Sequence, residues 1–229
     1  TLGATLAACM AGRRPSIRLA VDNWMPATDA YTHNFGRMAE EILCADVVSV
    51  LDRDIPSLDL LVAGPPCQGH SDLNNSTRRR DPRNELYLAP AEFAAKNRPQ
   101  VVVIENVPSV VHSAQNVVGR ARCRLRSAGY GCSERVFDTS ELGIPQRRRR
   151  HLLVGVRGQD DEWVSDRLET LATTAQVPAV MPFLEDLQDQ IDERDPMFAT
   201  TRLSSENKAR ISHLFKHDVY DLPDQLRPP

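Results

Sequence analysis

The chain has 229 residues, of which 41% are hydrophobic and 26% are charged, and its formal net charge is -3. This composition fits a globular domain with a substantial core and a smaller appendage, and it excludes a disordered chain. No window approaches the ~18 uninterrupted apolar residues of a membrane span. The five cysteines form no CxxC pair, which argues against both a metal site and a disulfide framework.

The first third of the chain predicts helices and strands in alternation. The expected elements are a helix at 2–11, a strand at 17–21 that ends at Asp22, a helix at 26–43, a strand at 45–50 and a strand at 58–63. The last strand stops at Gly64-Pro65-Pro66, because proline lacks the donor that a sheet ladder needs. Cys67 therefore follows a strand end, either as a buried structural cysteine or as a reactive one.

The middle of the chain repeats this design. A polar loop at 72–85 precedes a helix at 86–96, a strand at 101–104, a helix at 115–127 and two strands, 135–137 and 151–156, expected to pair antiparallel. The strand at 101–104 delivers Glu105 and Asn106 to the sheet edge. The alternation predicts an α/β fold with a doubly wound, mostly parallel sheet.

From about residue 157 the pattern breaks down, and prolines and acidic residues accumulate. We expect a catalytic domain at 1–156, then a separate and incomplete region at 157–229 with short helices near 183–190 and 205–215. Residues 1–156 hold 20 Lys+Arg against 16 Asp+Glu, whereas 157–229 hold 8 against 15, so an anionic partner suits the first part only. For the alternate arginines at 120–126 we favour a solvated surface.

Three strand ends carry reactive side chains, namely Asp22, Cys67 and Glu105. The carboxyl ends of parallel strands lie side by side, so these residues are expected to share one crevice. A thiol nucleophile beside a carboxyl group is a reaction centre in outline.

The motifs GPPCQGHS at 64–71, ENV at 105–107 and QRRRR at 146–150 resemble the cysteine loop, glutamate motif and Q-x-R-x-R motif of the DNA cytosine-5 methyltransferases. Two further segments, AVDNWMPATDAYTHNFG at 20–36 and ADVVSV at 45–50, also resemble that family, and the motifs occur in its order. The resemblance covers roughly residues 1–156. It implies a Rossmann-like methyltransferase fold with S-adenosyl-L-methionine as cofactor.

The resemblance also implies roles for individual residues. Cys67 matches the nucleophile that adds to carbon 6 of cytosine, which makes carbon 5 an enamine that attacks the methyl group. Glu105 matches the glutamate that binds ring nitrogen 3 and the exocyclic amine. Arg148 and Arg150 match the arginine pair, of which Arg150 is expected to contact the base and orient Glu105. Arg147 and Arg149 remain open as phosphate contacts.

The cofactor and DNA contacts follow from the same resemblance. Asp22 matches the carboxylate that accepts hydrogen bonds from the ribose, and Asp46 matches the acidic residue near adenine, with a solvated loop acid as its alternative. Pro66 and Leu86 match positions that line the cofactor pocket. The residues expected to contact DNA are Gln68, Ser71, Arg83 and Gln146. We expect no metal site.

The family's glycine-rich turn and its last two motifs are not found among these residues, so we expect a chain that is truncated at both ends. An incomplete cofactor pocket would weaken binding enough to abolish turnover. The resemblance implies methylation of a flipped cytosine in duplex DNA by a monomer of the bacterial cytoplasm and nucleoid, without membrane contact, with a restriction endonuclease as a possible partner. The alternatives are a transfer RNA cytosine-5 methyltransferase and a catalytically silent DNA-binding relative.

Overall fold

The computed structural model describes residues 1–66, 82–172, 179, 204–217, 219 and 222–227. The chain forms two compact units, Thr1–Ala179 and Val180–Pro229. The second unit contains the helix α7 (Ser205–His217), as expected near 205–215, and the short 3-10 helix η7 (Asp224–Leu226). The helix expected near 183–190 lies outside the described residues. Across the part of the chain that the structure describes, no helix is both long and apolar enough to cross a membrane.

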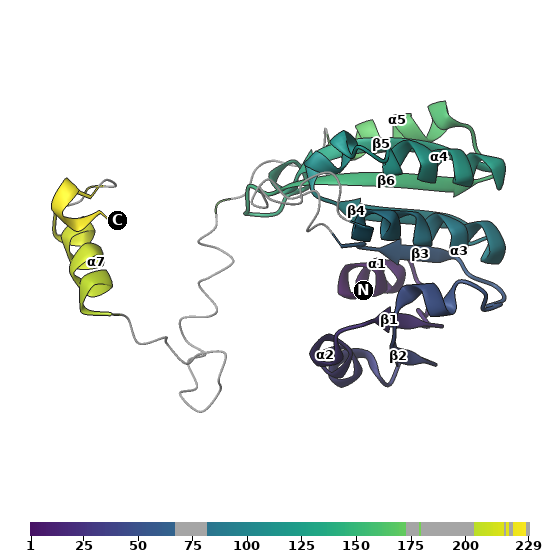
Figure 1. Cartoon of the computed structure of the whole chain (residues 1–229), viewed down its shortest axis with the longest axis horizontal. Coiled ribbons are helices and arrows are strands. Elements are labelled where there is room, and N and C mark those ends of the chain that lie inside the picture. The colour runs from purple at the N-terminus through teal and green to yellow at the C-terminus, as the bar shows by residue number, and fades with distance from the viewer. Residues whose placement is uncertain (67–81, 173–178, 180–203, 218, 220–221, 228–229) are drawn as a thin grey trace. The chain divides into compact units, whose positions relative to one another are not determined.

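The N-terminal segment forms a small parallel sheet flanked by helices (Figure 1). Its elements are α1 (Leu2–Met10), β1 (Ala20–Asp22), α2 (Met25–Phe35), β2 (Ile42–Cys44) and the 3-10 helix η1 (Val47–Val50). Asp22 lies opposite Cys44 in the β1–β2 ladder. The carboxyl ends of β1 and β2 therefore lie at the same edge of this sheet.

Two expectations for this segment are wrong. The helix expected at 26–43 ends at Phe35, because the chain then turns and its backbone bonds to Ile17, with Ile17 N donating to Met38 O at 3.0 Å. The strand expected at 45–50 is a 3-10 helix instead. Its cause is Asp46, whose carboxylate accepts a hydrogen bond from Val48 N at 2.9 Å and caps the first turn.

The larger sheet has the strand order β3-β4-β6-β5. Its strands are β3 (Leu60–Ala63), β4 (Val101–Asn106), β5 (Tyr130–Asp138) and β6 (Arg149–Arg157). The β3–β4 pair is parallel, and β6 runs antiparallel to both β4 and β5, which confirms the expected antiparallel pair. The α/β class is confirmed, but the described strands form two sheets and not one continuous sheet.

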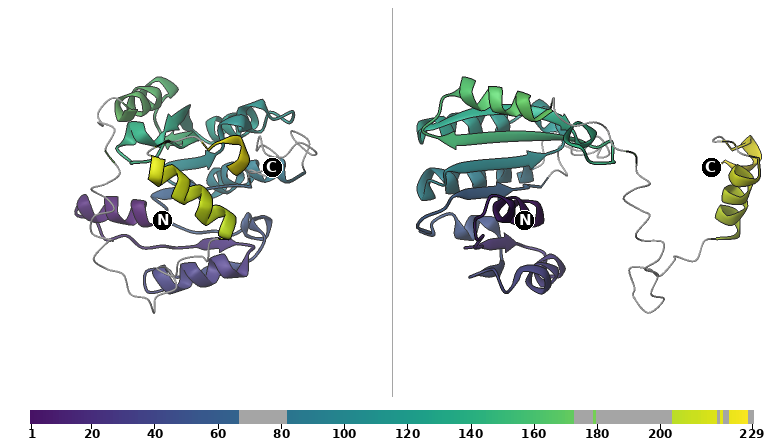
Figure 2. Two further views of the ribbon diagram at one scale, coloured as in Figure 1. Left: turned by 90° about the vertical axis from the view of Figure 1, so that its left-hand side faces the viewer. Right: turned by 180° about the vertical axis from the view of Figure 1, so that it is seen from behind.

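Helices cover both faces of the larger sheet (Figure 2). One face carries α3 (Ala89–Asn97) and α4 (Val117–Ser127), with the 3-10 helices η2 (Pro82–Leu88), η3 (Pro108–His112) and η4 (Thr139–Leu142) in the connections. The opposite face carries α5 (Asp161–Ala172), which the sequence did not lead us to expect. Residues immediately after 156 thus pack on the sheet.

The start of α5 is fixed to the edge strand β5. Asp161 Oδ1 accepts a hydrogen bond from Cys132 N at 2.6 Å, and this bond lowers the pKa of Asp161. A Cβ atom at Gly131 would lie 2.4 Å from the Asp160 carbonyl carbon, so only glycine admits the turn at this point. These contacts cover part of the exposed edge of the sheet.

The core lies between the larger sheet and α3 and α4. It includes Val102 and Ile104 of β4, Leu153 of β6 and Leu125 of α4, all fully buried. The alternation of buried positions along β4 places 102, 104 and 106 on this helical face, and Glu105 on the other face. The hydrophobic pattern of this strand therefore determines which way Glu105 points.

Leu125→Ala is expected to lower the free energy of unfolding by about 2–5 kcal/mol, because it leaves a cavity at a fully buried position. The Leu125 side chain packs against β6 at Gly155, where an added Cβ atom would lie 3.5 Å from Leu125 Cδ1. Urea unfolding measures the loss. Arg124→Gln on the same helix is the control and is expected to cost at most about 1 kcal/mol, because its ion pair is exposed. Equal losses for the two variants would contradict the assignment of the core.

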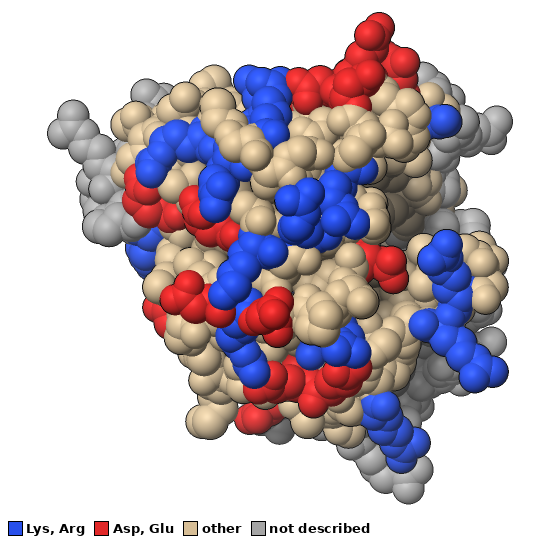
Figure 3. Space-filling model, turned by 90° about the vertical axis from the view of Figure 1, so that its right-hand side faces the viewer, with Lys and Arg blue, Asp and Glu red and all other residues tan. Residues whose placement is uncertain are grey.

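Each arginine of α4 pairs with a carboxylate of a different element. The pairs are Arg120 with Glu85 of η2, Arg122 with Glu134 of β5, Arg124 with Glu92 of α3 and Arg126 with Asp161 of α5. Figure 3, which views the side that faces right in Figure 1, shows basic and acidic side chains intermingled. This arrangement supports a solvated surface at 120–126 over a basic binding face.

Candidate active site

The candidate site lies where β4 ends and β6 begins, on the face opposite α3 and α4. Glu105 stands opposite Leu152 in the β4–β6 ladder, so Arg150 is its diagonal neighbour on the same face. Arg150 Nε donates to Glu105 Oε1 at 2.7 Å. The two side chains remain 23% and 41% exposed, respectively, so the pair is formed and is still accessible to a ligand.

The end of β3 lies against this carboxylate. A Cβ atom built on Gly64 would be 3.6 Å from Glu105 Oε2, which is ordinary van der Waals contact. Glu105 is thereby placed beside the segment that leads, three residues later, to Cys67. Cys67, Gln68 and Ser71 lie outside the described residues.

Asn106 ties β4 to that segment, and the sequence analysis did not include it among the site residues. Its side chain is only 1% exposed. Nδ2 donates to Pro65 O at 3.2 Å, and Oδ1 accepts from Val107 N at 2.9 Å. The signal in the sequence was its place in the ENV motif beside Glu105, but the partner 41 residues away in the chain is visible only in the fold.

Asn106→Ala is expected to lower the free energy of unfolding by about 1–3 kcal/mol, because the part-buried Pro65 carbonyl loses the hydrogen bond that the buried Asn106 amide donates. Chemical denaturation measures this change. Asn34→Ala is the control, since Asn34 Nδ2 donates to the carbonyl of Ala30 on the exposed surface of α2. A cost for Asn106→Ala no greater than that for Asn34→Ala would show that the bond to Pro65 contributes nothing.

The other residues of the arginine motif do not join the pair. Gln146, Arg147, Arg148 and Arg149 are exposed. The Arg148 backbone carbonyl accepts from Thr139 N at 2.9 Å, but its guanidinium forms no ion pair with any residue that the structure describes. Arg150 is thus the arginine of this motif that contacts Glu105.

The residues predicted to bind the cofactor lie at two separate locations in the structure. Asp22 and Asp46 lie together at the carboxyl edge of the small sheet, where Ala45 N donates to Asp22 O at 2.9 Å. Pro66 is exposed after β3, and Leu86 is half-buried in η2. No hydrogen bond or ion pair among the described residues joins these two places.

Asp22 and Asp46 each use one carboxylate oxygen within their own turns. Asp22 Oδ1 accepts from Trp24 N at 2.8 Å, and Asp46 Oδ1 accepts from Val48 N. The second oxygen of each carboxylate forms no hydrogen bond with the described part of the chain. Trp24, which the sequence analysis did not select, is 65% exposed beside Asp22 and could supply a flat apolar surface for a ligand ring.

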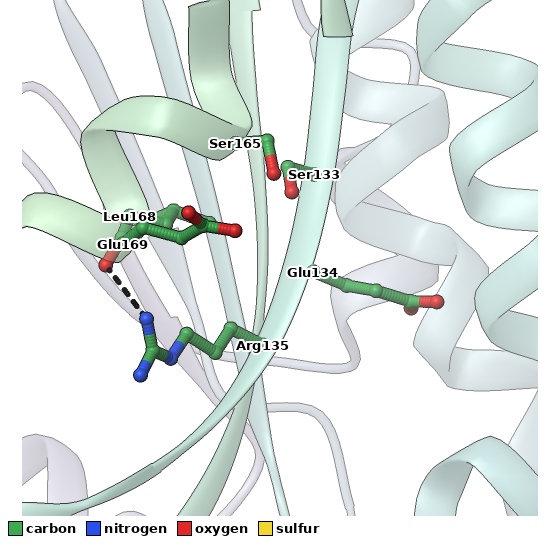
Figure 4. A pocket seen from close by; sticks show the side chains of 6 residues that line it. All are labelled: Ser133, Glu134, Arg135, Ser165, Leu168 and Glu169. Carbon is green, nitrogen blue, oxygen red and sulfur yellow. Dashed lines mark hydrogen bonds between the residues drawn. The ribbon is translucent and has the colours of Figure 1, made fainter. Parts of the chain in front are cut away.

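Arg83 lies on η2, directly after the undescribed segment, and is exposed. Among the residues with a description, no group of three or more His, Cys, Asp or Glu side chains could hold a metal ion. A hollow of about 510 Å³ lies between β5 and α5 (Figure 4). It includes none of the predicted site residues, and Arg135 spans it to the Leu168 carbonyl at 3.5 Å, so we place the candidate site at the strand ends instead.

Comparisons with known proteins concern the family and the fold of the chain. The family model described as "C-5 cytosine-specific DNA methylase" matches residues 3–223. Type II methyltransferase M1.BsuMI of Bacillus subtilis (strain 168) is 33% identical over 180 residues, which are 76% of this chain and 40% of that protein. Type II methyltransferase M.HhaI of Haemophilus parahaemolyticus is 30% identical over 57% of this chain and 39% of its own length.

The fold is also found among solved structures. The S. pombe Dnmt2 methyltransferase superposes with a TM-score of 0.60 at 24% identity, and the match covers 90% of this chain and 62% of that one. This likeness concerns the fold alone. The chain spans about two fifths of the length of the two curated relatives named above.

Proposed function

Because this chain belongs to the C-5 cytosine-specific DNA methylase family, we propose that it is the catalytic part of a DNA (cytosine-5-)-methyltransferase. The reaction transfers a methyl group from S-adenosyl-L-methionine to carbon 5 of a cytosine flipped out of duplex DNA. The observation that carries this proposal is the accessible Glu105–Arg150 pair beside the segment that leads to Cys67.

In the proposed mechanism, the Cys67 thiolate adds to carbon 6 while Glu105 donates a proton or a hydrogen bond at ring nitrogen 3. Arg150 holds the Glu105 carboxyl group and contacts the base. The electron pair released to carbon 5 would take up the methyl group, and the sulfur that carried it would keep the electrons of the broken bond and leave as S-adenosyl-L-homocysteine. A base then removes the proton at carbon 5, and the thiolate leaves carbon 6 as the double bond reforms.

The side chains at the carboxyl edge of the small sheet suit the proposed cofactor. The free oxygens of Asp22 and Asp46 can accept hydrogen bonds from ribose hydroxyls and the adenine amine, and Trp24 offers its ring face. Pro66 and Leu86 would complete the pocket. When bound, S-adenosyl-L-methionine supplies an electrophilic methyl group.

The DNA is proposed to bind over the strand ends. Gln68, Ser71, Arg83 and Gln146, with the exposed arginines at 147–149, would contact phosphates and sugars, which position a duplex without reading its sequence. Flipping the target base costs a few kcal/mol. We further propose a monomeric protein of the bacterial cytoplasm and nucleoid, with a cognate restriction endonuclease as a possible partner, since relatives carry the name Type II methyltransferase.

Methyl transfer from tritiated S-adenosylmethionine tests the proposal directly. The natural protein is expected to label duplex DNA and not transfer RNA. Labelling of transfer RNA alone would contradict DNA as the substrate and would favour the transfer RNA cytosine-5 methyltransferase instead. If the protein binds the cofactor and labels neither nucleic acid, the silent DNA-binding alternative holds instead.

A further inference from the structure

Two side-chain contacts with glutamates occur at consecutive residues of β6, one on each face of the sheet. Arg150 pairs with Glu105 on the face of the candidate site. His151 points to the helical face, where its Nε2 lies 3.2 Å from Glu134 Oε2 of β5. Glu134 is the diagonal neighbour of His151, because Val136 stands directly opposite it.

The ladder between β4 and β6 ends at His151. Its last aligned residues are Asn106 and His151, and Arg150 lies one position beyond them. The backbone at Arg150 is therefore aligned with Phe137 of β5 on one side, whereas on the β4 side it is held through its neighbour His151. A displacement of His151 would carry Arg150 away from Glu105.

His151 is buried, and its partner Glu134 also interacts with groups of two other elements. The His151 side chain is 1% exposed, as is that of Asn106 on β4. Glu134 of β5 also lies 3.6 Å from Arg122 Nη1 of α4. Tyr87 of η2 is buried, and its burial raises the pKa of the phenol. The negative charge of Glu134 raises this pKa further. A single carboxylate, Glu134, thus faces His151, Arg122 and Tyr87.

The neutral form of His151 suits this environment. Burial lowers the pKa of His151 and outweighs the opposing effect of Glu134. His151 Nδ1 is buried and has no hydrogen-bond partner among the described residues. A proton added there would create a charged donor with no acceptor, at a cost that the fold would relieve by moving the ring.

We propose that His151, paired with Glu134, is a positioning residue that fixes the first residues of β6 and so holds Arg150 against Glu105. This inference rests on the proposed function for its kinetic consequence. Protonation of His151 would loosen the start of β6 and weaken the contact between Arg150 and Glu105. The rate of methyl transfer should therefore fall at acid pH. The same proton destabilises the fold, because a group with a lowered pKa loses its contribution to stability as the pH falls below its unfolded value of about 6.5.

The pH dependence of single-turnover methyl transfer tests this inference in the natural protein. For the unmodified enzyme, the rate should fall at pH values below the ordinary histidine pKa of about 6.5, approaching tenfold per pH unit as one proton binds. His151→Gln cannot take up that proton and still offers an amide to Glu134, so its rate should persist to lower pH. Glu134→Gln removes the charge that favours the protonated ring and should move the acid limb in the same direction.

The control is Glu92→Gln, which removes a carboxylate from the exposed pair with Arg124 and should leave the profile unchanged. Identical acid limbs in the unmodified enzyme, His151→Gln and Glu134→Gln would overturn the inference. A reduced rate with an unshifted profile would mean a purely structural role for His151 and would overturn it as well.

A second readout does not need activity. The NMR signal of the Arg150 Nε–H group should shift with the protonation of His151 in the unmodified protein and stay constant over the same pH range in His151→Gln. If no methyl transfer occurs at any pH, the proposed function fails, and this signal still decides the inference. An Arg150 signal that ignores pH in both proteins would refute it.

Discussion

Glu105→Gln is expected to lower the rate of methyl transfer by about 10²- to 10⁴-fold, the usual contribution of a positioned general acid. Glutamine keeps the size of the side chain but cannot donate the proton that draws electrons from carbon 6. Glutamine also lacks the charge of the ionised Glu105 carboxylate, which attracts Arg150 before the proton is taken up and accepts a hydrogen bond from Arg150 Nε at 2.7 Å. Single-turnover transfer from tritiated S-adenosylmethionine to duplex DNA measures this loss.

Glu92→Gln is the matched control for Glu105→Gln. Glu92 is 46% exposed and paired at 2.7 Å with Arg124, so its environment resembles that of Glu105 without lying at the strand ends. Its rate is expected to remain near that of the unmodified enzyme. Should Glu105→Gln also transfer at that rate, Glu105 would have no part in the chemistry.

The pairing with Arg150 can be separated from the proton transfer by a double-mutant cycle. Arg150→Gln should slow the reaction, and the double variant should be less impaired than the product of the two single effects, because both variants break the same contact. Strictly multiplicative effects would mean that Arg150 acts on the base without orienting Glu105.

Cys67→Ser is expected to abolish covalent capture by a duplex that contains 5-fluorocytosine. After methyl transfer, the fluorine at carbon 5 cannot leave as a proton does, so the thioether to carbon 6 persists and the complex survives denaturing electrophoresis. Serine is a far weaker nucleophile than a thiolate, which removes the first step of the reaction. Methyl transfer to ordinary DNA should be lost together with capture.

Cys123→Ser provides the control for this experiment. Cys123 is an exposed free cysteine on α4, a helix that contributes no residue to the candidate site. Capture should be unchanged in this variant. If Cys67→Ser were still captured while Cys123→Ser was not, the nucleophile would have been misassigned. Loss of capture in both would indicate damage to the fold, which chemical denaturation detects.

The sequence by itself determined most of the order of elements. Apolar runs that end at proline or glycine predicted β3 and α4 close to their observed positions, because burial and backbone stereochemistry act over a few residues. It failed at 36–50 and at α5. There the decisive contacts were a backbone bond from Ile17 to Met38, a cap by Asp46, and an anchor from Asp161 to β5.

The candidate reactive side chains were also predicted from the sequence, since short motifs in a fixed order need no fold to be seen. Only the tertiary structure decided which side chains meet. It shows the pair of Arg150 with Glu105 that the resemblance implied, and it alone joins Asn106 to Pro65 and His151 to Glu134 on the opposite face of the sheet. The reason is that strand register is set by the whole sheet, and a shift of one residue would turn every one of these side chains to the opposite face.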